Sequence, residues 1–566
     1  MKTTITSGPA SLSRARLGTL LWCVLAAVVV LGHLRVTQGP RLENDSYEYL
    51  SVADDFLAGL PAYTSIVHFD PELSFGRVPA PLTTFPPGYP AAVGAVAAVT
   101  RLPTLWSAFA VSLAAFLLLV PVCAYASRLL GIGVPMAQLL LVWLIGNSWA
   151  SVYATGVLTE SLFTLTSVAA IVLLVAAMEE SAATTRAAAL AVAAGLLVGV
   201  SYWIRYAGVF LFAATLSFTL VRLVVSRDGS SRRAALSVAV AAALIAAGFV
   251  RNELLVGTWK GGNTKVVHHA LTAVLHQFAL WNYHLFLGGI ASARFGVAVA
   301  LVCAGAATAV AAVTVGRRLA TGAWSLRRII LAPPTLPLWY LIVYGAGMIY
   351  LGTSSVISFD TRMFYPVLPV MLLLTAWAWQ ALLAGLPAGS ARPVAAYSGL
   401  AVATLAYLLV NGRSYFTPMP VSADRIVARE LGPERPSDTS LRSWLESHVT
   451  PDDTMVANRG QASAYVLQRK TIALVSSEYS DRRWDERSVR ALMRTHDANF
   501  IVVYSGDGGD DVLRESSFLQ SLARLATPKW LELVAHNRDA AVFRLVPGPA
   551  LLGELPAADR TSINAE

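Results

Sequence analysis

Four charged side chains stand beside long apolar stretches of the sequence. Asp45 follows the first stretch, and Glu160 begins a later one. Arg205 and Arg362 occupy short turns next to two further stretches. Carboxylates can take a proton from a hydroxyl group, and a guanidinium can hold a phosphate through two hydrogen bonds. If the fold brings the four together, they suit the transfer of a group from a phosphate-bearing donor that is dissolved in a membrane.

Each of these residues also has a structural explanation. Asp45 can cap the helix that its neighbours predict, and Glu160 can interact favourably with a helix N-terminus. Either arginine can snorkel, with its stem on apolar surface and its charge in water. Asp54, on the helix predicted after Asp45, is expected to be solvated and to have no role. Only a site shared by all four charged side chains would favour a functional role over these structural explanations.

The elements that must position these residues are membrane spans. Of the 566 residues, 55% are hydrophobic and 14% are charged, and the mean hydropathy is +0.58. A soluble domain carries roughly 25% charged residues, so a soluble enzyme, a disordered chain and a fibrous protein are excluded. Apolar runs near 20 residues long indicate spans, and the sequence predicts about eleven. The runs are 17–34, 102–127, 134–154, 161–178, 187–204, 206–221, 234–250, 295–316, 335–352, 363–383 and 394–410.

Arginines between the runs predict how the chain crosses the membrane. Three basic residues, Lys2, Arg14 and Arg16, precede the first run, which we interpret as an uncleaved span that starts in the cytoplasm. Alternation then places the arginine-rich loops 222–233 and 317–328 in the cytoplasm, as the positive-inside rule requires. The same alternation predicts that the outer face holds the loops 35–101 and 251–294, the turns at Glu160, Arg205 and Asp360, and the region after about 411.

The predicted fold is mainly α: a polytopic transmembrane helix bundle with a small C-terminal α/β domain outside the membrane. We expect a cytoplasmic N-terminus (1–16), a transmembrane module (17–411) with the outer loop 35–101, a linker (412–436), the α/β domain (437–550) and a flexible tail (551–566). In the α/β domain, helices are predicted at 441–448 and 486–496. Strands are predicted at 454–458, 471–475, 499–504 and 540–546.

Other classes of site find little support in the sequence. The net charge of +9 comes without a basic stripe that carries interleaved aromatics, so nucleic acid is not expected as a partner. The three cysteines lie inside apolar runs, which argues against a disulfide framework or a cysteine-based zinc site. His268 and His276 share a helical face two turns apart, too far to chelate together. We therefore predict no metal site, and leave open one divalent cation as the only candidate cofactor.

Ordered motifs across residues 17–384 resemble the GT-C-type integral membrane glycosyltransferases, in particular protein O-mannosyltransferases and aminoarabinose transferases (glycosyltransferase family 39-like). The matching pieces are Asp45 with Tyr49, Leu57 and Gly59, the stretch 85–90 (FPPGYP), 159–163 (TESLF), the Arg205 turn, and Asp360, Arg362, Phe364, Pro366 and Pro369. In one departure from the family, Met363 follows Arg362 where relatives often carry tyrosine. The resemblance implies a sugar donor linked to a polyprenyl phosphate.

The resemblance also implies roles for residues. Asp45 would be the general base on the acceptor hydroxyl or amine, and Glu160 would orient the acceptor or bind the cation. Arg205, Arg362 and a lysine, Lys265 or Lys260, would hold the donor phosphate as it leaves. The expected place is the bacterial cytoplasmic membrane, where the partners are the lipid bilayer, the lipid-linked donor, and a glycan, lipid or protein acceptor.

Two other functions fit parts of the pattern. One is a transporter or flippase of lipid-linked saccharides, and the other is an oligosaccharide polymerase or ligase. Transporters tend to have paired halves and polar residues at mid-membrane depth. Here the predicted spans have almost no ionisable residues at their centres, and the polar residues gather on one face, which favours the transferase.

Overall fold

The computed structural model describes residues 9–60, 62–69, 71–180, 184–262, 267–287, 325–354, 359–384, 392–416, 441–480, 482–505 and 511–546. The chain divides into two units. Unit 1 comprises residues 1–63 and 81–421, and unit 2 comprises residues 64–80 and 422–566. The first outer loop, which we assigned as a whole to the transmembrane module, therefore gives residues 64–80 to unit 2.

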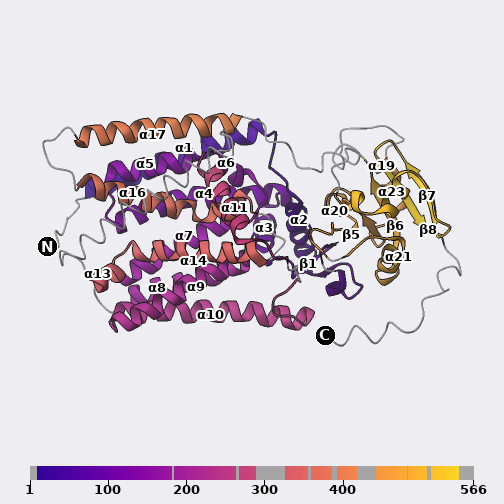
Figure 1. The fold of residues 1–566 in the computed structure, drawn as a ribbon, viewed down its shortest axis with the longest axis horizontal. Helices are drawn as coiled ribbons and strands as arrows, with labels where there is room; N and C mark the ends of the chain where they lie inside the picture. The colour runs from indigo at the N-terminus through magenta and orange to yellow at the C-terminus, as the bar shows by residue number, and fades with distance from the viewer. Residues whose placement is uncertain are drawn as a thin grey trace. The chain divides into compact units, whose positions relative to one another are not determined.

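Unit 1 is a helix bundle, in which α7, α8, α9, α10 and α14 lie side by side (Figure 1). Eight of its described helices are long and apolar enough to cross a membrane, and each coincides with a predicted run. This confirms the mainly α, polytopic architecture. Its helices are α1 (Pro9–Val36), α2 (Asn44–Leu57), α3 (Gly88–Thr100), α4 (Thr104–Leu129), α5 (Val134–Ile145), α6 (Ser148–Thr155), α7 (Glu160–Glu179), α8 (Thr185–Ile204), α9 (Gly208–Val225), α10 (Gly229–Val256), α11 (Leu271–Leu287), α13 (Leu326–Leu331), α14 (Thr335–Ser354), α15 (Thr361–Phe364), the 3-10 turn η2 (Tyr365–Val367), α16 (Leu368–Ala384) and α17 (Arg392–Phe416).

The remaining predicted runs have different outcomes. The run 134–154 forms two helices, α5 and α6, because the chain breaks at Gly146 and the Asn147 side chain caps α6 by accepting from the Ala150 N–H at 3.1 Å. The run 394–410 lies within α17. The run 295–316 falls outside the described residues.

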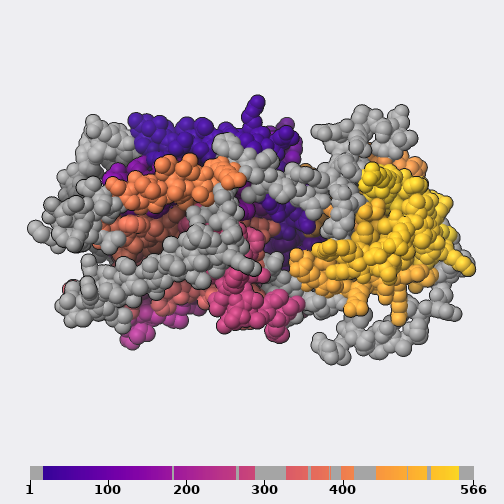
Figure 2. Space-filling model, turned by 45° about the horizontal axis from the view of Figure 1, so that its top comes forward, coloured from indigo at the N-terminus to yellow at the C-terminus, as the bar shows by residue number. Residues whose placement is uncertain are grey.

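The outer surface of unit 1 carries many large apolar side chains. On α1, Leu20, Val24 and Val28 are each more than half exposed, and on α17 so are Val402 and Leu405. Figure 2 shows part of this surface, with α17 in orange and α1 in indigo. An apolar surface of this extent suits hydrocarbon rather than water, which agrees with an integral membrane protein.

Unit 2 is an α/β domain built on one mixed sheet. The strand order is β2-β5-β4-β6-β8-β7, with the first four parallel and the last two antiparallel to their neighbours. Its apolar core includes Val456, Ile472, Ile501 and Phe543. The elements are β2 (Ile66–Val67), η1 (Pro71–Ser74), α19 (Leu441–His448), β4 (Thr454–Ala457), α20 (Gly460–Leu467), β5 (Lys470–Ala473), α21 (Glu486–Thr495), β6 (Ala498–Tyr504), α22 (Asp511–Glu515), α23 (Ser517–Ala523), β7 (Leu531–His536) and β8 (Ala540–Leu545). Short strands β1 (Tyr63–Thr64) and β3 (Ala80–Pro81) pair with each other.

The edge strand β2 comes from the first outer loop. Ile66 pairs with Thr471 and Val67 with Ile472, in parallel register. The same loop is tied to the domain a second time, because buried Ser74 and His496 hydrogen-bond through Oγ and Nε2 at 2.7 Å. The six predicted elements of the α/β domain are all present, whereas β2, β7 and the helices α20, α22 and α23 were not predicted.

Candidate active site

The four charged residues picked out in the sequence meet in one cluster of unit 1. The Arg362 guanidinium contacts Asp45 Oδ2 through Nη2 at 2.5 Å and Glu160 Oε1 through Nε at 3.1 Å. Arg205 Nη1 donates to the same oxygen of Glu160. Four separate segments of the chain supply these residues, so the meeting is a property of the fold.

Glu160 is the buried centre of the cluster. It is the first residue of α7, and its side chain is 0% exposed. A buried carboxylate is costly unless it is paired, and here two guanidinium groups share one of its oxygens. The chain before α7 is held in place by backbone hydrogen bonds: Arg41 N–H donates to Thr155 O at 3.1 Å, and Val157 N–H donates to Arg41 O at 3.0 Å. These bonds fasten the start of the first outer loop beside Glu160.

Arg205 projects from the tight turn between α8 and α9. The turn closes because Gly208, the first residue of α9, donates its N–H to Arg205 O at 2.8 Å. A Cβ at Gly208 would collide with the backbone of Tyr202 in the last turn of α8. The Arg205 side chain is thereby directed at the α7 N-terminus, where it also donates to Thr159 Oγ1 at 3.3 Å.

The motif FPPGYP lies directly against this turn. Gly88, the first residue of α3, packs on the backbone of Trp203, and a Cβ there would overlap the Trp203 carbonyl group. Tyr89, the next residue, is fully buried and its ring packs edge-to-face on Tyr49 of α2, with centroids 5.3 Å apart. The glycine in the motif is therefore explained by a close approach of α3 to α8.

Arg362 lies in the short helix α15, whose position is set by three side chains. Asp360 caps the helix by accepting from the Met363 N–H at 3.3 Å. Tyr344 OH donates to Met363 O at 2.7 Å, and the hydroxyls of Tyr153 and Thr361 hydrogen-bond at 2.7 Å. Burial raises the pKa of the Asp360 carboxyl, while the nearby Arg362 opposes that rise.

Sequence reasoning missed two members of the cluster, Arg41 and Glu43. Arg41 Nη2 contacts Glu43 Oε1 at 2.5 Å, and Glu43 Oε2 lies 3.9 Å from Arg362 Nη1. With Asp45 they form an alternation of charged and uncharged residues over 41–45 (RLEND). That alternation is a usable signal, because three charged residues within five positions after a span need water or partners.

The lysines and histidines give a more limited result. Lys265 lies outside the described residues. Lys260 is exposed and stands over the Trp259 ring at 5.7 Å from the centroid. Among the described residues, no group of three or more His, Cys, Asp or Glu side chains is placed to hold a metal ion. Glu160 Oε1 accepts from two arginines, whereas Glu160 Oε2 is buried and has no hydrogen-bond partner among the described residues.

Asp54 differs from the expectation that it is solvated. Its side chain is half-buried, and burial raises the pKa of its carboxyl although a hydrogen bond with Thr104 lowers it. The physical reason is that α2 packs against α4, which the spacing of apolar residues in α2 alone does not show.

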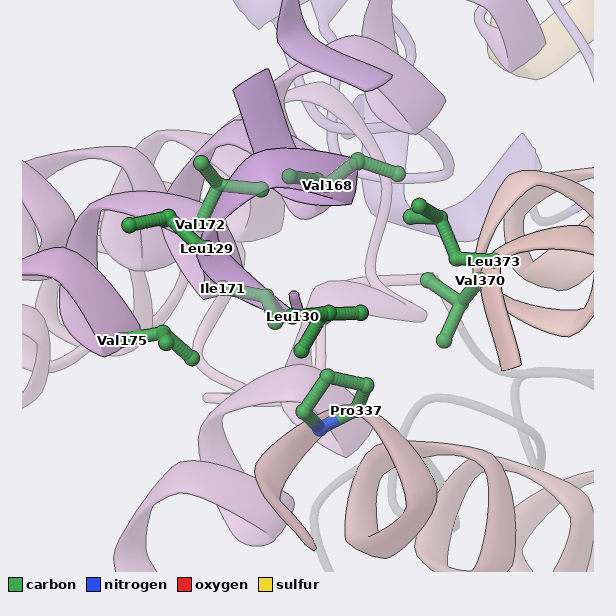
Figure 3. A pocket seen from close by; sticks show the side chains of 10 residues that line it. Leu129, Leu130, Val168, Ile171, Val172, Val175, Pro337, Val370 and Leu373 are labelled. Atoms are coloured by element: carbon green, nitrogen blue, oxygen red, sulfur yellow. The ribbon is translucent and has the colours of Figure 1, made fainter. Parts of the chain in front are cut away.

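A separate cavity in unit 1 is lined only by apolar side chains, among them Val168, Ile171 and Val175 of α7 (Figure 3). With a rise of about 1.5 Å per residue, these positions lie roughly 12–22 Å along α7 from Glu160. The cavity lacks polar groups and carries no chemistry of its own.

Comparisons with known proteins find similarity in structure and not in sequence. No protein-family model matches the chain, and no curated protein matches it. ArnT from Cupriavidus metallidurans, solved with undecaprenyl phosphate bound, superposes with a TM-score of 0.57 at 15% identity, over 95% of this chain and 99% of that one. The oligosaccharyltransferase AglB from Archaeoglobus fulgidus, in complex with an inhibitory peptide and a dolichol-phosphate, gives a TM-score of 0.51 at 13% identity, over 86% of this chain and 69% of that one. The chain therefore has the fold of the GT-C glycosyltransferases, as its ordered motifs predict.

Proposed function

We propose that this protein is a membrane glycosyltransferase that moves a sugar from a polyprenyl-phosphate-linked donor to an acceptor at the outer face of the bacterial cytoplasmic membrane. The observation that carries the proposal is the single cluster formed by Asp45, Glu160, Arg205 and Arg362. These are the residue types that such a transfer needs, and the apolar bundle around them suits a donor with a lipid tail.

In the proposed reaction, an acceptor oxygen or nitrogen attacks the anomeric carbon of the donor sugar. The bond from that carbon to the phosphate oxygen breaks, and the polyprenyl phosphate leaves with the electron pair. Asp45, whose side chain is 22% exposed, takes the proton of the acceptor. Arg362 and Arg205 stabilise the charge that grows on the departing phosphate. ArnT, which shares the fold, was solved with undecaprenyl phosphate, and this supports a donor of the same class.

The side of the membrane is supported by connectivity and charge. The pairing of β2 with β5 requires the first outer loop and the α/β domain to be on the same side. The arginine-rich loop 222–233 belongs on the opposite, cytoplasmic side under the positive-inside rule. Asp45 lies in the first outer loop, so the same reasoning puts the cluster on the outer face.

The test begins with a strain that lacks the gene. We expect it to accumulate one polyprenyl-phosphate sugar and to lose that sugar from an envelope glycan, lipid or protein, which mass spectrometry of both fractions would reveal. The purified protein in lipid nanodiscs should then transfer the sugar from the accumulated lipid. Movement of intact lipid-linked saccharide across vesicles without transfer would instead identify a transporter. An unchanged lipid and glycan profile would contradict the proposal.

A further inference from the structure

Asp45 is already paired with the Arg362 guanidinium, which is the group that a donor phosphate needs. Arg362 is held by Asp45 at 2.5 Å and by Glu160 at 3.1 Å, with Glu43 at 3.9 Å. The charge-assisted hydrogen bonds that would recognise a phosphate oxygen are the same in kind as those that Asp45 already accepts. A phosphate on Arg362 therefore enters in competition with a carboxylate.

The charge balance of the cluster makes that competition strong. Within the part of the chain that the structure describes, its ion pairs join three guanidinium groups to three carboxylates, those of Arg41, Arg205 and Arg362 with those of Glu43, Asp45 and Glu160. Each of these guanidinium groups thus already has a carboxylate partner, and an added phosphate can pair with one of them only if a carboxylate moves away.

We infer that Asp45 is an internal counter-ion that the donor phosphate displaces from Arg362, so that donor binding itself releases the carboxylate that acts as base. This rests on the proposed function and deepens it. It assigns Asp45 a second role, which is to neutralise the phosphate site while the site is empty.

Asp45 is the carboxylate able to leave, whereas Glu160 is not. The Glu160 side chain is 0% exposed and would be left charged without solvent, although Arg205 would remain beside it. The Asp45 side chain is 22% exposed and lies in the first turn of α2, where water and the positive end of the helix can stabilise the free carboxylate. The displaced group therefore stays charged, and stays able to accept a proton.

This arrangement orders the reaction. With no donor bound, the carboxylate is paired with Arg362 and is a weak base toward an acceptor hydroxyl. With donor bound, the base is no longer paired with Arg362 and lies beside the sugar that is to be transferred. We expect the donor to bind first and the acceptor second.

The experiment measures binding of undecaprenyl phosphate to the full chain in nanodiscs, with no turnover involved. Asp45→Asn removes the competing charge, so this variant should bind the probe about fivefold tighter than the unaltered protein, the effect of roughly one half-buried ion pair. Asp45→Ser serves as a second variant if Asp45→Asn folds poorly. Asp452→Asn removes the same charge from a side chain that is 98% exposed in unit 2, and should leave affinity unchanged.

The outcomes separate the two proposals. If the unaltered protein binds the probe and both Asp45 variants bind it equally or more weakly, Asp45 orients Arg362 and the displacement is overturned. If the unaltered protein and the Asp45 variants all fail to bind, the polyprenyl-phosphate donor is wrong as well. In an Arg362→Ala background the gain from Asp45→Asn should vanish, and its persistence would show that Asp45 acts through another group.

Discussion

Asp45 is the side chain at which binding and turnover should separate. Asparagine keeps its shape but cannot take a proton, so Asp45→Asn should lower the rate of sugar transfer on the order of 10²–10⁴-fold. The measurement is turnover in nanodiscs with saturating donor. Asp452→Asn is the matched control, because the Asp452 side chain is exposed to solvent. Asp54→Asn does not serve as a control, because the Asp54 side chain is half-buried. Near-normal turnover in Asp45→Asn would move the base to another residue.

The two arginines of the cluster should differ in their sensitivity to lysine. Lysine keeps the charge but loses the planar fork. Arg362 forms ion pairs with three carboxylates from two segments of the chain, whereas Arg205 contacts Glu160 alone among the carboxylates of the cluster described above. We expect Arg362→Lys to raise the KM for donor roughly 10–100-fold, since one lost charged hydrogen bond costs about 1.5–3 kcal/mol. Arg205→Lys should raise the KM for donor by a smaller factor.

Arg101, which is exposed at the end of α3, provides the control for that pair. Arg101→Lys should leave the KM for donor unchanged. If Arg362→Lys and Arg205→Lys also use donor normally, both arginines are structural partners of Glu160 and do not bind phosphate.

At the scale of elements, the contact of α3 with α8 should affect both the stability of the protein and the rate of sugar transfer. Any Cβ at Gly88 meets the backbone of Trp203, two residues before Arg205. Overpacking of this kind costs about 1–3 kcal/mol, so Gly88→Val should lower both the melting temperature and the rate of transfer. Gly399→Ala, at a helical position with nothing within 4 Å, is the control and should leave both unchanged. Full activity in Gly88→Val would mean that this contact does not position Arg205.

Elements and site were predictable to different degrees. Helices such as α7 and α8 are predicted well because each is a long apolar run with charges only at its ends. The break at Gly146 was missed because both halves are apolar, and β2 was missed because two residues carry no periodicity. Residue types and their place at span ends identified Asp45 and Arg362, but Arg41 was missed because its place in the cluster depends on its ion pair with Glu43 and on its backbone hydrogen bonds beside α7.

At the scale of the whole molecule, the orientation in the membrane can be checked directly. The odd number of predicted spans and the arginine-rich loops predict that the region after about 411 is extracytoplasmic. A reporter that works only in the cytoplasm, fused after Glu566, should therefore be silent. The same reporter inserted in the loop 222–233 should be active. Strong signal from the C-terminal fusion would overturn the outer-face location of the cluster.

The discontinuity of unit 2 has a consequence for how the protein is made. β2 is synthesised about 400 residues before β5, the strand with which it pairs. At roughly 5–20 residues per second, it waits on the order of 20–80 seconds for that partner. The first loop is therefore made early, and its strand β2 stays without its sheet partner until β5 has been synthesised. A ribosome that stalls between the two strands leaves a chain whose first loop has no β5 to pair with. Residues 64–80 are thus a part of unit 2 that is made without its sheet partner β5 in every chain whose synthesis stops between the two strands.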